Sequence, residues 1–137
     1  MAAWLMKSEP GAYSLADLER DGRTRWDGVR NYQARNFLRD AVRAGDRVLF
    51  YHSNAEPPGV AGIAKVVRGG YPDPRDPTWA CVDLAFDERF PRFVPLEAMK
   101  AEARLTGMLV LRRGMRLSVQ PVEESHFGRV LVMGREP

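Results

Sequence analysis

Short apolar segments separated by turn residues run along the whole chain. Strands are predicted where hydrophobic residues are continuous or alternate with polar ones, at 3–7, 46–53, 60–67, 79–86 and 116–122. A loop around Pro57, Pro58 and Gly59 joins the second and third of these strands, which favours a hairpin with a longer connection. The segment 71–78 holds three prolines and three charged residues, so it is predicted to be a surface loop.

Helical spacing and capping residues predict four helices, at 14–21, 32–43, 95–101 and 123–132. Ser14 is a typical N-cap, Asp17 completes a capping box, and Gly22 ends the first helix. The helix at 32–43 has an apolar stripe, through which Phe37 and Leu38 are expected to pack on a sheet. Short strands mixed with short helices indicate an α+β domain built as a small barrel with helices around it.

Length and composition indicate one soluble globular domain with one core. The chain has 137 residues, of which 45% are hydrophobic and 28% charged. We see no apolar run long enough for a membrane helix and no signal-peptide pattern at the N-terminus. A single cysteine, Cys81, excludes a disulfide framework within the chain, so a cytoplasmic protein is expected.

Arginine dominates the positive charge. The chain carries 21 basic and 18 acidic residues, a net charge of +3, and 18 of the basic residues are arginine. Between Arg20 and Arg47 there are eight arginines and four acids, while the remainder is close to neutral. Such a segment suits phosphate groups, because guanidinium donates two parallel hydrogen bonds, although solvated surface arginines would have the same pattern.

A catalytic or metal centre is not predicted. The two histidines, His52 and His126, and the one cysteine make a poor metal site, and no phosphate-binding glycine loop is present. A serine such as Ser8 or Ser53 beside His52 has no spacing that supports a nucleophile. We therefore expect neither cofactor nor enzymatic activity.

Polar and aromatic residues instead gather where the predicted strands end. They lie in the strings Lys7-Ser8-Glu9-Pro10, Trp26-Asp27-Gly28-Val29-Arg30-Asn31, Tyr51-His52-Ser53-Asn54 and Ser118-Val119-Gln120-Pro121. Together they supply an aromatic face and polar groups that can stack a flat heterocycle and bond its edge. For single residues a structural role remains open: Trp26 as core, Asn31 as a helix cap, and Gln120 as a partner for a backbone group.

These strings resemble the EVE domain family over essentially the whole chain, 1–137, in the same order. The most specific is Trp26-Asp27-Gly28-Val29-Arg30-Asn31-Tyr32-Gln33-Ala34-Arg35-Asn36-Phe37-Leu38. The resemblance implies a PUA-like mixed β pseudo-barrel of five to seven strands, related to the ASCH and YTH groups. One difference is a shorter loop after Tyr71-Pro72-Asp73-Pro74, where EVE domains usually have further residues before the next tryptophan.

The resemblance also implies a function, namely holding a flipped, modified base, most readily a modified cytosine of DNA, in a cleft. The predicted base-binding residues are Lys7, Ser8, Glu9, Trp26, Asn31, Tyr51, His52, Ser53 and Gln120. Trp26 is expected to stack on the base, Asn31 is the first candidate to bond its polar edge, and Glu9 suits a cytosine amino group. The predicted phosphate-binding residues are Arg23, Arg25, Arg30, Arg35 and Arg39.

Some alternatives stay open. Strand alternation places Tyr51 and Ser53 on one face and Phe50 and His52 on the other, so only a bulge near the strand end would turn either pair into the cleft. A module that reads modified or structured RNA is a second hypothesis, and an enzyme acting on a nucleobase or nucleotide is a third.

Overall fold

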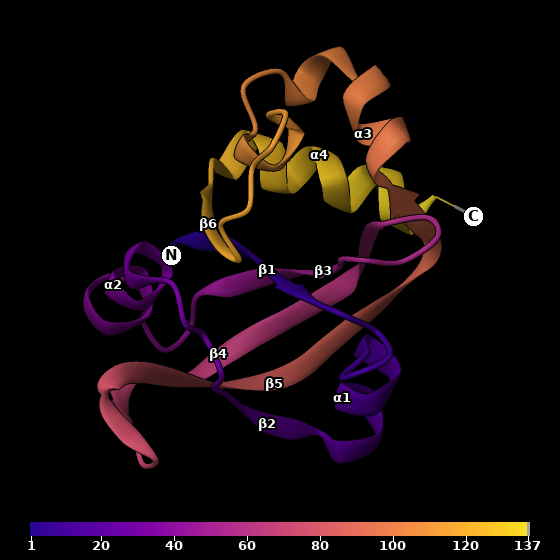
Figure 1. Ribbon diagram of the computed structural model, residues 1–137. Coiled ribbons are helices and arrows are strands. Elements are labelled where there is room, and N and C mark those ends of the chain that lie inside the picture. The colour runs from indigo at the N-terminus through magenta and orange to yellow at the C-terminus, as the bar shows by residue number, and fades with distance from the viewer. Residues whose placement is uncertain (137) are drawn as a thin grey trace.

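A six-stranded mixed sheet with helices on both faces forms the core of the computed structural model, which describes residues 1–136 (Figure 1). Its strands are β1 (Ala3–Ser8), β2 (Arg23–Trp26), β3 (Arg47–His52), β4 (Gly59–Asp73), β5 (Asp76–Pro95) and β6 (Val119–Val122). The helices are α1 (Leu15–Asp21), α2 (Tyr32–Asp40), α3 (Leu96–Ala101), α4 (Glu124–Arg135) and the 3₁₀ turns Ala103–Leu105 and Leu109–Leu111.

The strand order is β2-β5-β4-β3-β1-β6, and β1 with β3 is the one parallel pair among the described strands. The two end strands, β2 and β6, do not pair with each other, so the sheet curves without closing into a full barrel. The predicted α+β class and the predicted number of strands are confirmed. The exposed edges lie at β2 and β6, which are also the shortest strands, as is usual for sheet edges.

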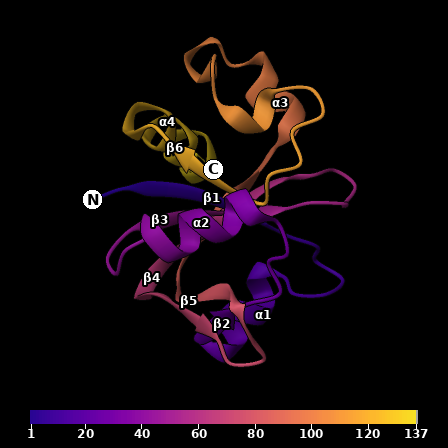
Figure 2. The same cartoon turned by 60° about the vertical axis from the view of Figure 1, so that its left-hand side comes forward.

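Apolar side chains pack on both faces of the sheet. Along β1, Trp4 and Met6 belong to one buried cluster, while Ala3 and Leu5 belong to another, as strand alternation requires. The first cluster is covered by α1 and α2 and the second by α3 and α4, which Figure 2 shows from the side. The prediction of one core is therefore corrected to two apolar layers that share one sheet.

The first two helices begin as predicted. Ser14 and Asp17 form a reciprocal capping box, and Gly22 follows the last turn of α1. Leu38, on the inner side of α2, is fully buried, and the centroid of the Phe37 ring lies 5.5 Å from that of Trp4. The predicted packing of this helix on the sheet is therefore confirmed. The second helix ends at Asp40, three residues earlier than expected, because the amide groups that follow turn back toward the Phe37 carbonyl.

Two segments differ from the predicted pattern. The prediction of a surface loop at 71–78 is wrong. Strands β4 and β5 continue through this segment as one long hairpin, which turns at Pro74 and Arg75. Side chains fasten this hairpin: the Tyr71 hydroxyl donates to Asp83, and the Arg75 amide donates to Asp73 Oδ1 at 2.9 Å. Strand β2 was not expected, because four residues with two arginines carry little periodicity, and pairing with β5 defines it.

None of the α-helices within residues 1–136 is long and apolar enough to cross a membrane. In the same part of the chain, no group of three His, Cys, Asp or Glu side chains is placed to hold a metal ion. Cys81 is buried in β5, and burial raises the pKa of its thiol to about 11.

Candidate functional site

A cleft of about 440 Å³ opens between the end of β1, strand β2 and the loop that leads to α2. We call it the Trp26 cleft. Its lining residues are Lys7, Ser8, Glu9, Ala12, Tyr13, Thr24, Arg25, Trp26, Asp27, Gly28, Val29, Arg30 and Ser118. The volume lies within the range of small-molecule sites, and a single base or nucleoside is of a suitable size.

Trp26 is the aromatic wall of this cleft and also part of the core. Trp26 is the last residue of β2 and is 9% exposed. Its ring packs edge to face with that of Phe50, and the two ring centroids are 5.5 Å apart. Gly28 makes the turn that follows with a φ of 77°, a conformation that other residues rarely adopt. The strand and the turn therefore hold the indole rigidly, with a part of it open to the cleft.

Hydroxyl groups also line the cleft. Ser8 Oγ donates to the Tyr13 carbonyl at 2.6 Å, which leaves its oxygen lone pairs free to accept from a ligand. The Tyr13 hydroxyl donates to Asp21 at 2.9 Å, and burial is the main cause that raises its pKa. Ser118, in the segment before β6, adds another hydroxyl. The backbone carbonyl of Ser118 accepts from the Lys7 amide at 2.9 Å.

Charges of both signs stand at the cleft. Arg25 and Asp27 form an ion pair of 3.1 Å, and Glu9 is exposed at the end of β1. Arg30 also lines the cleft, and its guanidinium lies 3.4 Å from the buried carboxylate of Asp73. An aromatic face with donors and acceptors around it suits a flat, uncharged heterocycle better than a strongly charged ligand.

The structure brings four of the predicted base-binding residues together in this cleft: Lys7, Ser8, Glu9 and Trp26. Asn31 and Gln120 lie elsewhere, so their placement is corrected. Asn31 caps α2, its Oδ1 accepting from the Ala34 amide at 3.0 Å, and Gln120 is 1% exposed, its amide donating to the Leu117 carbonyl. Both residues therefore have the structural roles that the sequence left open.

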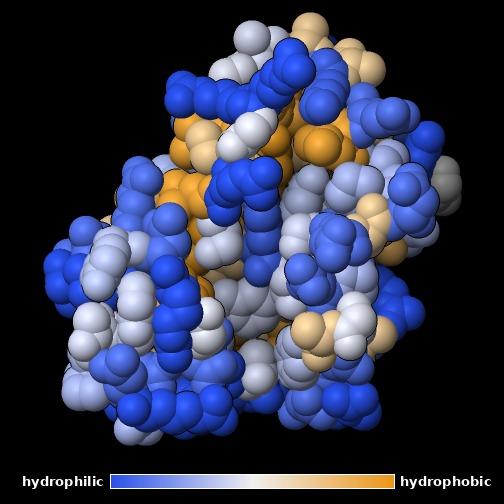
Figure 3. All heavy atoms as spheres, viewed as in Figure 1, coloured by the Kyte–Doolittle hydropathy of each residue, from blue (hydrophilic) through white to orange (hydrophobic). Residues whose placement is uncertain are grey.

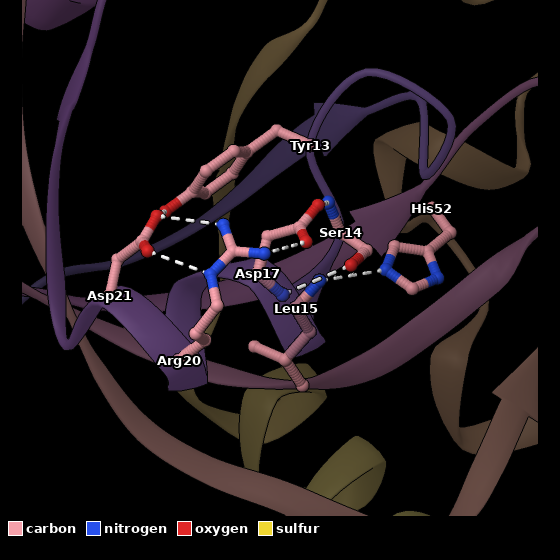
Figure 4. Close-up of polar contacts among 7 residues, drawn as sticks. All are labelled: Tyr13, Ser14, Leu15, Asp17, Arg20, Asp21 and His52. Carbon is pink, nitrogen blue, oxygen red and sulfur yellow. Dashed lines mark hydrogen bonds and ion pairs between the residues drawn. The ribbon is translucent and has the colours of Figure 1, made fainter.

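His52 and Ser53 also lie outside the Trp26 cleft. His52 Nε2 accepts from the Leu15 amide at the start of α1, at 3.2 Å, as Figure 4 shows. Burial lowers the pKa of this imidazole, and its ring stands between Phe50 and Phe93. The Ser53 amide donates to the Ser8 carbonyl, so its backbone joins the two parallel strands.

Tyr51 faces a second hollow, on the other face of the sheet from Phe50. The alternation predicted for this strand is therefore confirmed, and the register shift at Phe50 and Tyr51 does not bring either pair into the Trp26 cleft. The second hollow measures about 520 Å³ and lies beside α3 and the segment before β6. Lys7 borders both hollows.

The predicted phosphate-binding arginines are mostly engaged with acidic neighbours. Four of them form ion pairs of 2.8 to 3.4 Å: Arg23 with Asp83, Arg25 with Asp27, Arg30 with Asp73 and Arg39 with Asp40. The fifth, Arg35, donates to the Thr78 carbonyl at 2.8 Å and lies over the Tyr32 and Trp79 rings. Only Arg25 and Arg30 line the Trp26 cleft.

Sequence reasoning missed several residues that line the cleft, among them Tyr13, Thr24, Asp27 and Ser118. Asp27 and Ser118 belong to strings singled out in the sequence, so a signal for them existed. Tyr13 and Thr24 carried none, because their position depends on the turn after β1 and on a strand that the pattern did not reveal.

The open six-stranded sheet and a cleft large enough for a single base define this protein as a small α+β domain with a binding cleft. The family model described as EVE domain matches residues 2–133. Human thymocyte nuclear protein 1 is 39% identical over an alignment of 162 positions, which covers 93% of this chain and 72% of that protein. The chain therefore belongs to the EVE domain family.

Solved structures share the fold closely. A protein from Pseudomonas putida has a TM-score of 0.91 and 44% identity, covering 98% of this chain and 100% of its own. Human THYN1 in complex with DNA that contains 5-methylcytosine has a TM-score of 0.88 and 37% identity, covering 100% of this chain and 99% of its own. An ASCH protein from Zymomonas mobilis, at 9% identity and a TM-score of 0.55, shares the fold alone.

Proposed function

We propose that this protein binds DNA and holds a modified cytosine, flipped out of the duplex, in the Trp26 cleft. The observation that carries the proposal is the likeness to human THYN1, which was solved with DNA containing 5-methylcytosine and matches this chain over its full length. The cleft supports it with an aromatic wall, four hydroxyl-bearing side chains and a volume of about 440 Å³.

Each group in the cleft suits part of a cytosine. The Trp26 indole offers a face on which a base stacks, worth about 1–3 kcal/mol and enough to offset much of the few kcal/mol that flipping costs. Glu9 and Asp27 carry carboxylates, which accept from the exocyclic amino group of cytosine. Hydroxyl groups such as that of Ser8 supply donors or acceptors for the remaining edge.

Binding without turnover is part of the proposal. Asp27 is paired with Arg25, Ser8 Oγ donates to the Tyr13 carbonyl, and Glu9 is exposed at the end of β1. General acid–base chemistry would need a group within hydrogen-bond reach of the reacting atom and a means to activate water.

The test compares DNA duplexes that are identical except for one cytosine, which is plain or carries a 5-methyl group. Tighter binding of the methylated duplex, with the modified nucleoside recovered unchanged after incubation, supports the proposal. Equal affinity for both duplexes contradicts it. Preference for a matched RNA would favour the RNA-binding alternative, and loss of the modified base would favour an enzyme.

A further inference from the structure

The hollow beside Tyr51 has a charge pattern that the Trp26 cleft lacks. We call it the basic cleft. Its functional groups are Lys7, Tyr51, Lys100, Arg112, Arg113 and Arg116. The remaining lining residues are apolar or glycine, and no Asp or Glu of the described chain lines it. Five cationic side chains thus share one concave surface of about 520 Å³.

These cations are also unpaired, in contrast to the other arginines. Lys100, Arg112, Arg113 and Arg116 form no ion pair with any residue of 1–136, whereas the arginines predicted to bind phosphate are mostly matched with acids. The sequence explains this difference, because the segment 103–122 contains no Asp or Glu. Charges of one sign gathered in a hollow repel one another and attract an anion.

The local backbone holds this arrangement in place. The turn from Arg112 to Gly114 closes with the Met115 amide donating to the Arg112 carbonyl at 3.2 Å, and Gly114 has a φ of 75°. Lys7 Nζ donates to the Met115 carbonyl at 3.0 Å, which joins the turn to the end of β1. Burial and the charge of Arg116 both lower the pKa of Lys7, as expected for a cation held among others.

Figure 3 shows the surroundings of this region. Hydrophilic side chains cover most of the face, and hydrophobic residues are visible mainly in its upper part, around α3, α4 and the segment that leads into β6. Arginine stems can lie along such apolar surface while their guanidinium groups face solvent. Lys100, Arg112, Arg113 and Arg116 are exposed, so an anionic ligand can reach the hollow from solvent.

We propose that the basic cleft binds the phosphodiester backbone of the DNA strand whose base enters the Trp26 cleft. The inference rests on the proposed function, and the link between the two clefts is Lys7, which lines both of them. Arginine forks in the basic cleft donate to phosphate oxygens and position the strand, while the Trp26 cleft discriminates between bases. Phosphate contacts are thereby assigned to Arg112, Arg113 and Arg116 rather than to the arginines of 23–39.

The experiment uses the full chain with Arg112→Gln, Arg113→Gln and Arg116→Gln, singly and together. Arg92→Gln is the matched control, because Arg92 is an exposed arginine in a different hollow that also contains Glu136. Affinity is measured for the methylated and plain duplexes between about 50 and 200 mM salt, a range over which phosphate contacts dominate the change in affinity. Circular dichroism checks that each variant is folded.

Each substitution in the basic cleft is expected to reduce the slope of log affinity against log salt by about 1 and to weaken both duplexes by the same factor. The ratio between methylated and plain duplex stays that of the wild type, and Arg92→Gln changes neither quantity. Wild-type slope and affinity in the triple variant would overturn the inference. The two proposals are tested by different quantities. The salt slope, measured on plain DNA as well, tests the basic cleft, whereas equal affinity of the wild type for the methylated and plain duplexes would contradict the proposed function.

Discussion

Replacing Trp26 with leucine separates its role in the core from its role in the cleft. The substitution removes the edge contact with Phe50, worth about 0.5–1.5 kcal/mol. It also leaves a cavity of roughly 60 Å³, which at about 24 cal/mol per Å³ costs about 1.5 kcal/mol. We therefore expect the free energy of unfolding, measured with urea, to fall by about 2–3 kcal/mol while the chain remains folded.

The effect on binding is expected to be selective. Loss of a stacking face worth about 1–3 kcal/mol weakens the methylated duplex by about 5- to 150-fold, because only a flipped base uses that face. Affinity for the plain duplex, which depends on phosphate contacts, stays near the wild-type value. Both duplexes are compared in the same titration.

Trp4→Leu is the matched control. Trp4 is 4% exposed, belongs to the same apolar cluster and does not line the cleft. Its Nε1 donates to Asp46 at 3.0 Å, so the control loses at least as much stability as the test variant. If both variants weaken the methylated duplex equally, or neither does, the assignment of Trp26 as the stacking wall is refuted.

The remaining predictions concern stability. Asn31→Ala removes the cap on the Ala34 amide and is expected to cost about 1 kcal/mol while base discrimination is unchanged; a change in discrimination would return Asn31 to the site. Gly62→Ala places a Cβ 2.1 Å from a backbone carbonyl and should lower the melting temperature strongly, whereas Gly128→Ala, with open space in α4, should raise stability by about 0.5–1 kcal/mol. Burial lowers the pKa of the His52 imidazole from 6.5 in the folded protein. Below about pH 6.5 the imidazole therefore takes up a proton more readily in the unfolded state than in the folded state. Wild-type stability should therefore fall as pH drops below about 6.5, and it should fall less in His52→Gln; parallel pH profiles would contradict this reasoning.

The sequence predicted the helices well because their ends are chemically marked. Ser14, Asp17 and Gly22 bound α1 through local hydrogen bonds that need no tertiary contact. Strand β2 and the extension of the β4–β5 hairpin over 71–78 were missed because tertiary pairing defines them. Their residues, such as Pro72 opposite Ala80, have little strand propensity of their own.

The candidate site was predicted in part for a similar reason. Ser8 and Trp26 were found because the ends of β1 and β2 converge, as the polar strings suggested. Asn31 and Gln120 were misplaced because an amide side chain suits a ligand, a helix cap or a backbone carbonyl equally well. The basic cleft escaped notice because acids elsewhere in the chain cancel the arginines of 103–122 in a net count.

The crystal structure of this protein with a duplex that contains one 5-methylcytosine tests the central claim most directly. Our account predicts that the methylated base lies outside the duplex, in the Trp26 cleft, stacked on the indole with its polar edge toward Ser8 and the nearby carboxylates. A methylated base that remains stacked within the duplex, with the Trp26 cleft empty of it, would contradict the account.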